Sequence, residues 1–167
     1  AFIDQMAALL DTDAGGLNEL AKSHTTIYPI ASRCGVFAKT DVQPLLNEGA
    51  KREDIAASIF QSVVTQTISG LACGRPIRGN VAFLGGPLQY LPELRRRFYE
   101  TLELEDEAII VPANAHLFVA CGAAIAGARD GAKVETLKDV LIRLEGLGDI
   151  QGSEVDRLSP LFASEEE

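Results

Sequence analysis

Apolar residues recur with two different spacings along the chain. From residue 53 to residue 71 they return every three or four positions, on more than one side of a helix, which predicts a long buried helix. Residues 81–84 and 108–111 are short, wholly apolar runs of the kind that forms strands, and we expect the first to be buried on both faces. This mixture of helices and short strands predicts an α/β fold.

Helical spacing also occurs before and after these strands. It predicts helices over roughly residues 2–10, 17–21, 40–47, 91–102, 117–128 and 137–144. A turn is expected at Gly15 and Gly16, and a short extended segment at residues 34–38. The stretch 117–128 is too short to cross a bilayer, so we expect a buried helix there. Asn114 would cap this helix, and its small residues would let a neighbouring backbone approach closely.

Length, net charge and cysteine content exclude several classes of protein. With 167 residues, 47% of them hydrophobic, the chain can build one core without disulfides. Its formal net charge of -9 argues against binding to nucleic acid or to an anionic membrane. The three cysteines are odd in number, lie far apart and form no CxxC pair. This pattern argues against a disulfide framework or a zinc ribbon and favours a reducing, cytoplasmic setting.

The two ends of the chain predict a piece of a longer protein. The first residues already have helical spacing, with no initiator methionine and no charged and apolar leader before them. We expect residues 1–150 to form one folded lobe. Residues 151–167 lose the hydrophobic period and end in glutamates, so we expect them to form a linker or a solvated acidic tail.

The sharpest local motif is Gly85-Gly86-Pro87, between a predicted strand and a predicted helix. Two glycines let a ligand press against the backbone without interference from Cβ atoms, and the start of a helix offers N–H groups to polar or negative ligand atoms. The motif therefore favours a nucleotide site. It also suits an ordinary turn that needs a positive φ, and it is neither a GxxxxGK[ST] loop nor a GxGxxG fingerprint.

Cys34 is the cysteine with the strongest candidate chemistry. It lies in Ser32-Arg33-Cys34-Gly35, where the neighbouring arginine favours the thiolate and the glycine leaves it accessible. A buried packing role is the alternative, and we predict such a role for Cys73 and Cys121. His24 and His116 have no carboxylate or cysteine at ligand spacing, so they give little support to a metal site.

Several segments in order resemble one protein family. They are residues 1–6, 32–38, 51–55, 81–87 and 120–124. Together they are similar to the ATPase activators of 2-hydroxyacyl-CoA dehydratases and benzoyl-CoA reductases, the BadF/BadG/BcrA/BcrD ATPase family, also called CoA-substrate-specific enzyme activases. The resemblance covers roughly residues 1–128, and the segment 85–98 looks like that of the long, multidomain members.

The resemblance implies an actin-like, ribonuclease H-like ATPase of two lobes, of which this chain would be the C-terminal one. Gly85, Gly86 and Pro87 would form the adenosine loop for ATP or ADP with Mg²⁺. Cys34 would be one of two cysteines per subunit that hold a 4Fe-4S cluster across a homodimer. The implied task is ATP-dependent transfer of a low-potential electron to an acyl-CoA dehydratase or reductase.

Departures from the family leave two other functions open. The phosphate loops and the partner cysteine would lie upstream of Ala1, so we expect this chain alone neither to hydrolyse ATP nor to assemble a stable cluster. A sugar- or metabolite-kinase-like lobe would keep the adenosine loop while Cys34 only packs. A non-catalytic docking module of a larger polypeptide would fit the acidic tail.

Overall fold

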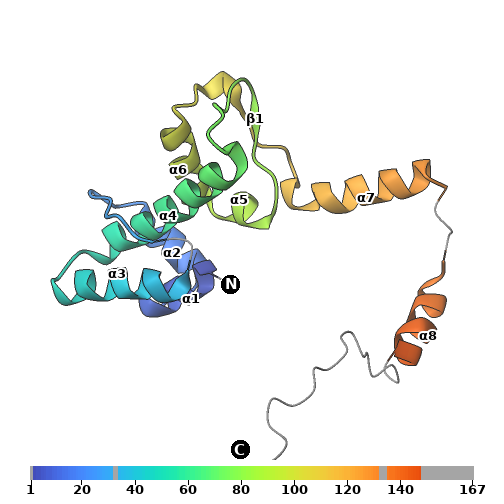
Figure 1. Ribbon diagram of the computed structural model, residues 1–167, viewed down its shortest axis with the longest axis horizontal. Helices are drawn as coiled ribbons and strands as arrows, with labels where there is room; N and C mark the ends of the chain where they lie inside the picture. The colour runs from blue at the N-terminus through green and yellow to red at the C-terminus, as the bar shows by residue number, and fades with distance from the viewer. Residues whose placement is uncertain (1, 32–33, 132–134, 148–167) are drawn as a thin grey trace, which may run out of the picture. The chain divides into compact units, whose positions relative to one another are not determined.

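The computed structural model describes residues 2–31, 34–131 and 135–147. They fall into two compact units, one up to Ile125 and one from Ala126 onward (Figure 1). The elements are α1 (Phe2–Leu9), α2 (Ala14–Ala21), α3 (Gly35–Asn47), α4 (Arg52–Ala72), β1 (Val81–Ala82), α5 (Gly86–Tyr90), α6 (Pro92–Leu102), η1 (Asp106–Ala108), β2 (Ile109–Ile110), η2 (Ala115–Leu117), α7 (Phe118–Arg129) and α8 (Leu137–Leu147). The first unit ends within α7, and α8 belongs to the second. The predicted acidic tail lies outside the described residues.

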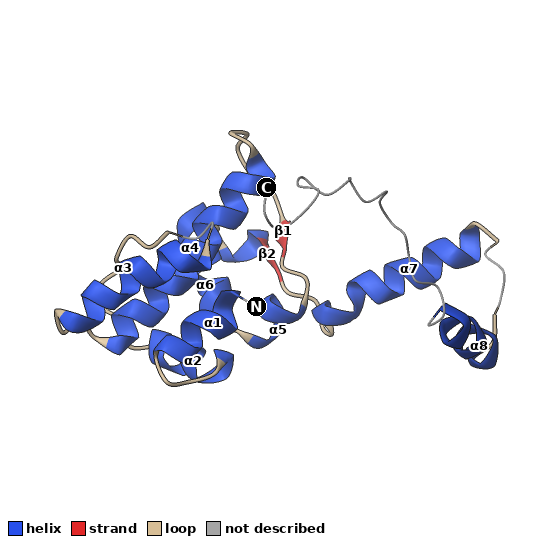
Figure 2. Cartoon of the chain, turned by 60° about the horizontal axis from the view of Figure 1, so that its bottom comes forward, coloured by secondary structure: helices blue, strands red, loops and turns tan. Residues whose placement is uncertain are grey.

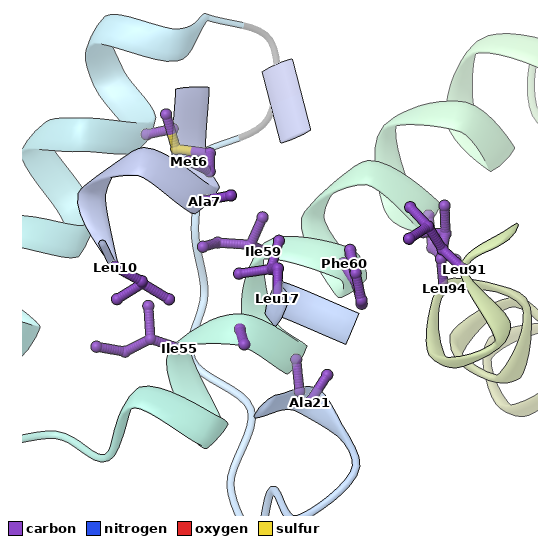
Figure 3. Packing of buried hydrophobic residues seen from close by; sticks show 14 of the residues in the cluster. Met6, Ala7, Leu10, Leu17, Ala21, Ile55, Ile59, Phe60, Leu91 and Leu94 are labelled. Atoms are coloured by element: carbon purple, nitrogen blue, oxygen red, sulfur yellow. The ribbon is translucent and has the colours of Figure 1, made fainter. Parts of the chain in front are cut away.

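The long helix α4 is the centre of the first unit. It packs against α1, α2, α3 and α6, and the side chains of Ile55, Ile59 and Phe60 are fully buried. Figure 3 shows Ile59 turned toward Leu17 of α2 within this core. By length and composition alone α4 is apolar enough to cross a membrane, but its burial among the other helices identifies it as a core helix. The long helix expected from the sequence is therefore confirmed, but its buried residues end at Val64, and Leu71 is 79% exposed.

The two strands form a small parallel sheet, drawn in red in Figure 2. Val81 pairs with Ile109, and the N–H of Phe83 donates a 2.9 Å hydrogen bond to the carbonyl of Ile110. The ring of Phe83 packs edge-on against Phe98 and Tyr99 of α6, with centroids 5.8 and 5.0 Å apart. Phe83 thereby packs the end of β1 against α6, and Val81 and Ile109 of the sheet also pack against the core.

The prediction that residues 81–84 are buried on both faces is wrong. Phe83 is buried, but its neighbours Ala82 and Leu84, which alternate with it along the strand, are exposed. The physical reason is that α6 packs against the side that carries Phe83, whereas alternate side chains along a strand point to the opposite face. The apolar run therefore predicted the strand correctly, but it did not predict which of its side chains are buried.

Two helices begin earlier than their sequences indicate. Gly15 and Gly16 lie in the first turn of α2 rather than in a turn before it, because Asp13 caps the helix and its Oδ1 accepts a 2.7 Å hydrogen bond from the N–H of Gly16. The predicted extended segment 34–38 is also wrong. After Cys34 the chain is helical, and Thr40 donates its hydroxyl to the carbonyl of Val36 inside α3.

The prediction that 117–128 forms a buried helix is wrong in its burial. The segment is helical, but no residue of α7 is buried, and Val119 is 82% exposed. A Cβ atom on Gly122 would meet no atom within 4 Å, so no described backbone approaches it closely. Asn114 precedes η2 in the left-handed conformation and makes no side-chain capping bond, so its predicted capping role is also wrong.

A buried carboxylate at the start of α4 holds the chain that follows α2. Residues 25–31 belong to no helix or strand, and the N–H groups of four of them, Thr25, Thr26, Tyr28 and Ala31, bond to side chains. Oδ1 of Asp54 accepts hydrogen bonds from the N–H of Thr25 at 2.6 Å and of Thr26 at 2.9 Å. The bond from Thr25 is the main reason that the pKa of Asp54 lies below its ordinary value, although burial opposes the shift.

Two more side chains continue this arrangement toward Cys34. The hydroxyl of Ser58, one turn beyond Asp54, accepts a 2.7 Å hydrogen bond from the N–H of Tyr28. Asp41 of α3 then accepts a 2.7 Å bond from the N–H of Ala31. Four N–H groups of the segment therefore bond to side chains of α4 and α3 instead of to a neighbouring strand.

We predict that Asp54→Asn lowers the free energy of unfolding by about 1 kcal/mol at pH 7, because a charged acceptor is replaced by a neutral one. The folded pKa of Asp54 is lowered, so its stabilisation is present above the unfolded value of about 3.9 and is lost as pH falls through the folded pKa. Urea unfolding across this range should show the wild type and the variant converging at low pH. Glu53→Gln, in the same helical turn but not fully buried, is the matched control and should show a smaller change.

Candidate functional site

Gly85 follows β1 and has a backbone conformation that only glycine adopts readily. Its φ of 98° and ψ of 163° fall in a region closed to residues with a Cβ atom. The N–H of Gly85 donates a 3.1 Å hydrogen bond to the carbonyl of Ala115, and its carbonyl accepts a 2.9 Å bond from the N–H of Gln89. Glycine at this position is therefore required by the turn itself.

Gly86 differs from its neighbour. It is the first residue of α5 with an ordinary φ, and a Cβ atom built on it would meet no atom within 4 Å. Nothing in the described fold therefore requires glycine at this position. Gly86 does line a cavity of about 250 Å³, together with Pro87, Tyr90 and other residues. The remaining lining residues are Ile3, Asp4, Ala14 and Leu91.

The loop is tied to η2 by a side chain that sequence reasoning missed. Oε1 of Gln89 accepts a 3.2 Å hydrogen bond from the N–H of Ala115. Gln89 and Gly85 are therefore both hydrogen-bonded to Ala115. Next to this contact the rings of Tyr90 and His116 pack with centroids 5.4 Å apart. A glutamine four residues after a glycine in a loop carries no recognisable motif, which is why the sequence did not reveal it.

The helix expected at 91–102 is confirmed, and a short helix that the sequence did not predict comes before it. The helix expected at 91–102 is α6, whereas Gly86 and Pro87 begin α5, a separate five-residue helix. Leu91 divides the two helices because Pro92 starts α6. One turn and a half gives little helix dipole, so the chemistry of this cavity depends on its exposed backbone and ring rather than on a helix terminus.

Cys34 lies in a second location, at the residue before α3. Its backbone is extended, with φ −140° and ψ 125°, and its side chain is half-buried. The backbone N–H groups of Phe37 and then of Val36, in the first turn of α3, lower the pKa of the Cys34 thiol. Arg33, which the sequence suggested as a partner, lies outside the described residues.

The structure does not bring Cys34 together with the glycine loop. Cys34 lines a cavity of about 530 Å³ with Phe37 of α3, Thr65 of α4 and other residues of α4 and the segment 25–31. That cavity shares no lining residue with the one beside Gly86. The described part of the first unit therefore contains two separate candidate sites.

The predicted packing roles of Cys73 and Cys121 are wrong, because both side chains are exposed. Cys73 ends α4 in the left-handed conformation, with its thiol 3.2 Å from the carbonyl of Gly70, and Cys121 lies on the uncovered helix α7. Among the described residues, no three His, Cys, Asp or Glu side chains gather as a metal-binding group. Cys34 fits a cluster as a single thiolate ligand, and the other thiolates of a four-cysteine cluster would have to come from elsewhere.

The sequence and the fold of this chain are both similar to those of known proteins. No family model matches the chain. The chain is 34% identical over 124 residues to the 2-hydroxyisocaproyl-CoA dehydratase activator of Clostridioides difficile, a match that covers 74% of this chain and 45% of the relative. It is 38% identical over 88 residues to the (R)-2-hydroxyglutaryl-CoA dehydratase activating ATPase of Acidaminococcus fermentans, covering 53% of this chain and 34% of that protein. The chain is related to the activators of 2-hydroxyacyl-CoA dehydratases.

Solved structures of dehydratase activators have the same fold. The crystal structure of the Acidaminococcus fermentans (R)-2-hydroxyglutaryl-CoA dehydratase component A matches with a TM-score of 0.67 at 33% identity, covering 79% of this chain and 49% of that one. The 2-hydroxyisocaproyl-CoA dehydratase activator from Clostridium difficile, solved with bound ADPNP, matches with a TM-score of 0.65 at 30% identity, covering 95% and 51%. The chain thus spans about half the length of these activators. The activator resemblance and the actin-like α/β fold class expected from the sequence are confirmed.

The two glycines should respond differently to the same substitution. We predict that Gly85→Ala lowers the free energy of unfolding by about 1–3 kcal/mol, because alanine is strained at that φ and ψ. Gly86→Ala should leave it unchanged or raise it by up to about 1 kcal/mol, because a helical position with open space accepts alanine. Urea unfolding of both variants measures the difference. Equal losses would contradict the separate roles assigned to the two residues.

The Cys34 thiol should ionise at a lower pH in the folded protein than in the unfolded chain, because its pKa is lowered by the start of α3. Alkylation by iodoacetamide, followed site by site by mass spectrometry across a pH series, measures this. The same series in urea provides the control for the intrinsic reactivity of the thiol. A rate profile that does not move between the two conditions would refute the prediction.

Proposed function

We propose that this chain is the part of an ATP-dependent activator that binds the adenosine of ATP and one side of a 4Fe-4S cluster. The whole protein would pass a low-potential electron to a 2-hydroxyacyl-CoA dehydratase or a benzoyl-CoA reductase-type enzyme. The observation that carries the nucleotide assignment concerns Gly86. No contact of the described fold requires glycine at this position, yet Gly86 lines a cavity. The relationship to dehydratase activators, one of them solved with ADPNP, supports it.

The adenosine loop would consist of Gly85, Gly86 and Pro87. Gly85 sets the turn, and Gly86 leaves its backbone bare at the cavity wall, so a ligand can approach closely there. Pro87 fixes φ at the start of α5 and keeps the loop rigid. The whole protein would hydrolyse ATP to ADP and phosphate, with Mg²⁺ on the phosphate groups.

The cluster would be shared between two copies of the protein. Cys34 contributes one thiolate from each copy, and a 4Fe-4S cluster with four cysteine ligands needs a second cysteine from each. When bound, the cluster supplies a site that accepts and releases one electron. The apolar side chains of Val36 and Phe37, next to Cys34, support a covered interface because Phe37 is 65% exposed in the single chain.

The partner and location follow from the same proposal. A dehydratase or reductase that acts on an acyl-CoA would receive the electron. The names of the related activators support a dehydratase as this partner. Low-potential electron transfer and free thiols fit the reducing cytoplasm.

The experiment uses two variants of the full-length protein, purified without oxygen, and measures both ATP binding and iron content in each. Gly86→Val should weaken ATP binding and leave the iron content unchanged, whereas Cys34→Ser should lose iron and keep its affinity for ATP. This crossed result is expected because the two cavities share no lining residue. Wild-type protein should hold about four irons per dimer.

Cys73→Ser is the matched control, because it removes a described thiol that lies outside both cavities. Iron that does not depend on Cys34 would remove the electron-transfer assignment and leave a kinase-like lobe as the better explanation. ATP affinity that is indifferent to valine at position 86 would remove the adenosine assignment. Each half of the proposal is therefore tested separately.

A further inference from the structure

The cavity beside Gly86 is lined by an aromatic side chain that remains largely exposed. Tyr90 lines the cavity, and its side chain is 66% exposed. The next residue, Leu91, is buried in the core. Two consecutive residues therefore differ in role, because Leu91 packs in the core and the ring of Tyr90 is exposed. An exposed tyrosine face beside bare backbone is the combination that receives a flat, apolar ligand surface.

The ring of Tyr90 is also held in place. It packs against His116, with centroids 5.4 Å apart and planes inclined by 44°. His116 follows Ala115, which is bonded to both Gly85 and Gln89, so the ring and the glycine loop are fixed to the same turn η2. A ring with a fixed position loses less freedom on binding than a free side chain does.

The size of the cavity indicates which part of a ligand it suits. A volume of about 250 Å³ is smaller than the roughly 300–1,000 Å³ usual for a whole ligand of drug size. It suits one planar ring, with the rest of the molecule outside. Most of its lining is apolar, from Ile3, Ala14, Pro87 and Leu91, which also favours a nucleobase over a phosphate group.

We propose that Tyr90 is the residue on which the base of the bound nucleotide stacks, with His116 as the residue that positions the tyrosine ring. The inference rests on the nucleotide site of the proposed function and adds a recognition element outside the glycine loop. Stacking on an aromatic ring accepts any base, so Tyr90 contributes affinity for the base and little discrimination between bases.

The test compares ATP with inorganic tripolyphosphate, which lacks the base, on the full-length protein with Mg²⁺. Tyr90→Ala should weaken ATP binding about tenfold, the loss expected for one stacked base, and leave tripolyphosphate binding unchanged. Tyr90→Phe should keep the affinity for ATP, because the ring face remains. Phe118→Ala removes another exposed ring that does not line the cavity and should have no effect.

A tryptophan in place of the tyrosine reports stacking directly. Tyr90→Trp should bind ATP and change its indole fluorescence on addition of ATP but not of tripolyphosphate, measured against the wild type. ATP affinity unchanged in Tyr90→Ala, or equal loss of both ligands, would overturn the inference while leaving the nucleotide site in place. Wild-type protein that binds no ATP would overturn the proposed function, and this inference with it.

Discussion

The carboxylate of Asp54 is the constraint on which the first unit depends. It is buried at the start of the central helix, where it accepts two N–H groups from a segment that has no partner strand. A buried charge of this kind is tolerated only when its oxygens are satisfied, so the segment must follow α4. Ser58 and Asp41 hold the same segment at Tyr28 and Ala31, and the backbone of Cys34 itself is extended. Polar side chains of two helices, rather than a neighbouring strand, thus hold the segment 25–31.

The other candidate site is built on a different principle. Its loop is shaped by Gly85, whose backbone excludes other residues, and is tied to η2 through Ala115. Phe83, two residues earlier, fastens the sheet to α6 through ring contacts. The two sites therefore share the α4 core but depend on separate local contacts. Loss of one set of contacts need not disturb the other.

Periodicity was sufficient to predict the central helix and the two strands, because each has a strong apolar pattern of its own. It failed where contacts distant in sequence decide the outcome. Residues 34–38 look extended by composition, yet Gly35 begins a helix whose register is set within α3 and by the segment before it. Burial of 81–84 and of 117–128 was overestimated, because apolar composition does not say whether a covering element is present among the described residues. Of the candidate site residues, the glycine pair and Cys34 were found from their local motifs. Gln89 and Tyr90 were not, because their roles arise from contact with η2.

The uncovered helix α7 has a consequence for how the chain behaves at high concentration. It carries apolar side chains such as Phe118, Val119 and Ile125 toward solvent, with no opposing polar face. Contiguous surfaces of this kind drive colloidal self-association, which like charge on the molecules resists. The net charge of -9 therefore provides a repulsion that falls as salt screens it or as pH approaches the isoelectric point near 4.7. Higher ionic strength, or a pH closer to the isoelectric point, thus lowers the protein concentration at which the molecules aggregate.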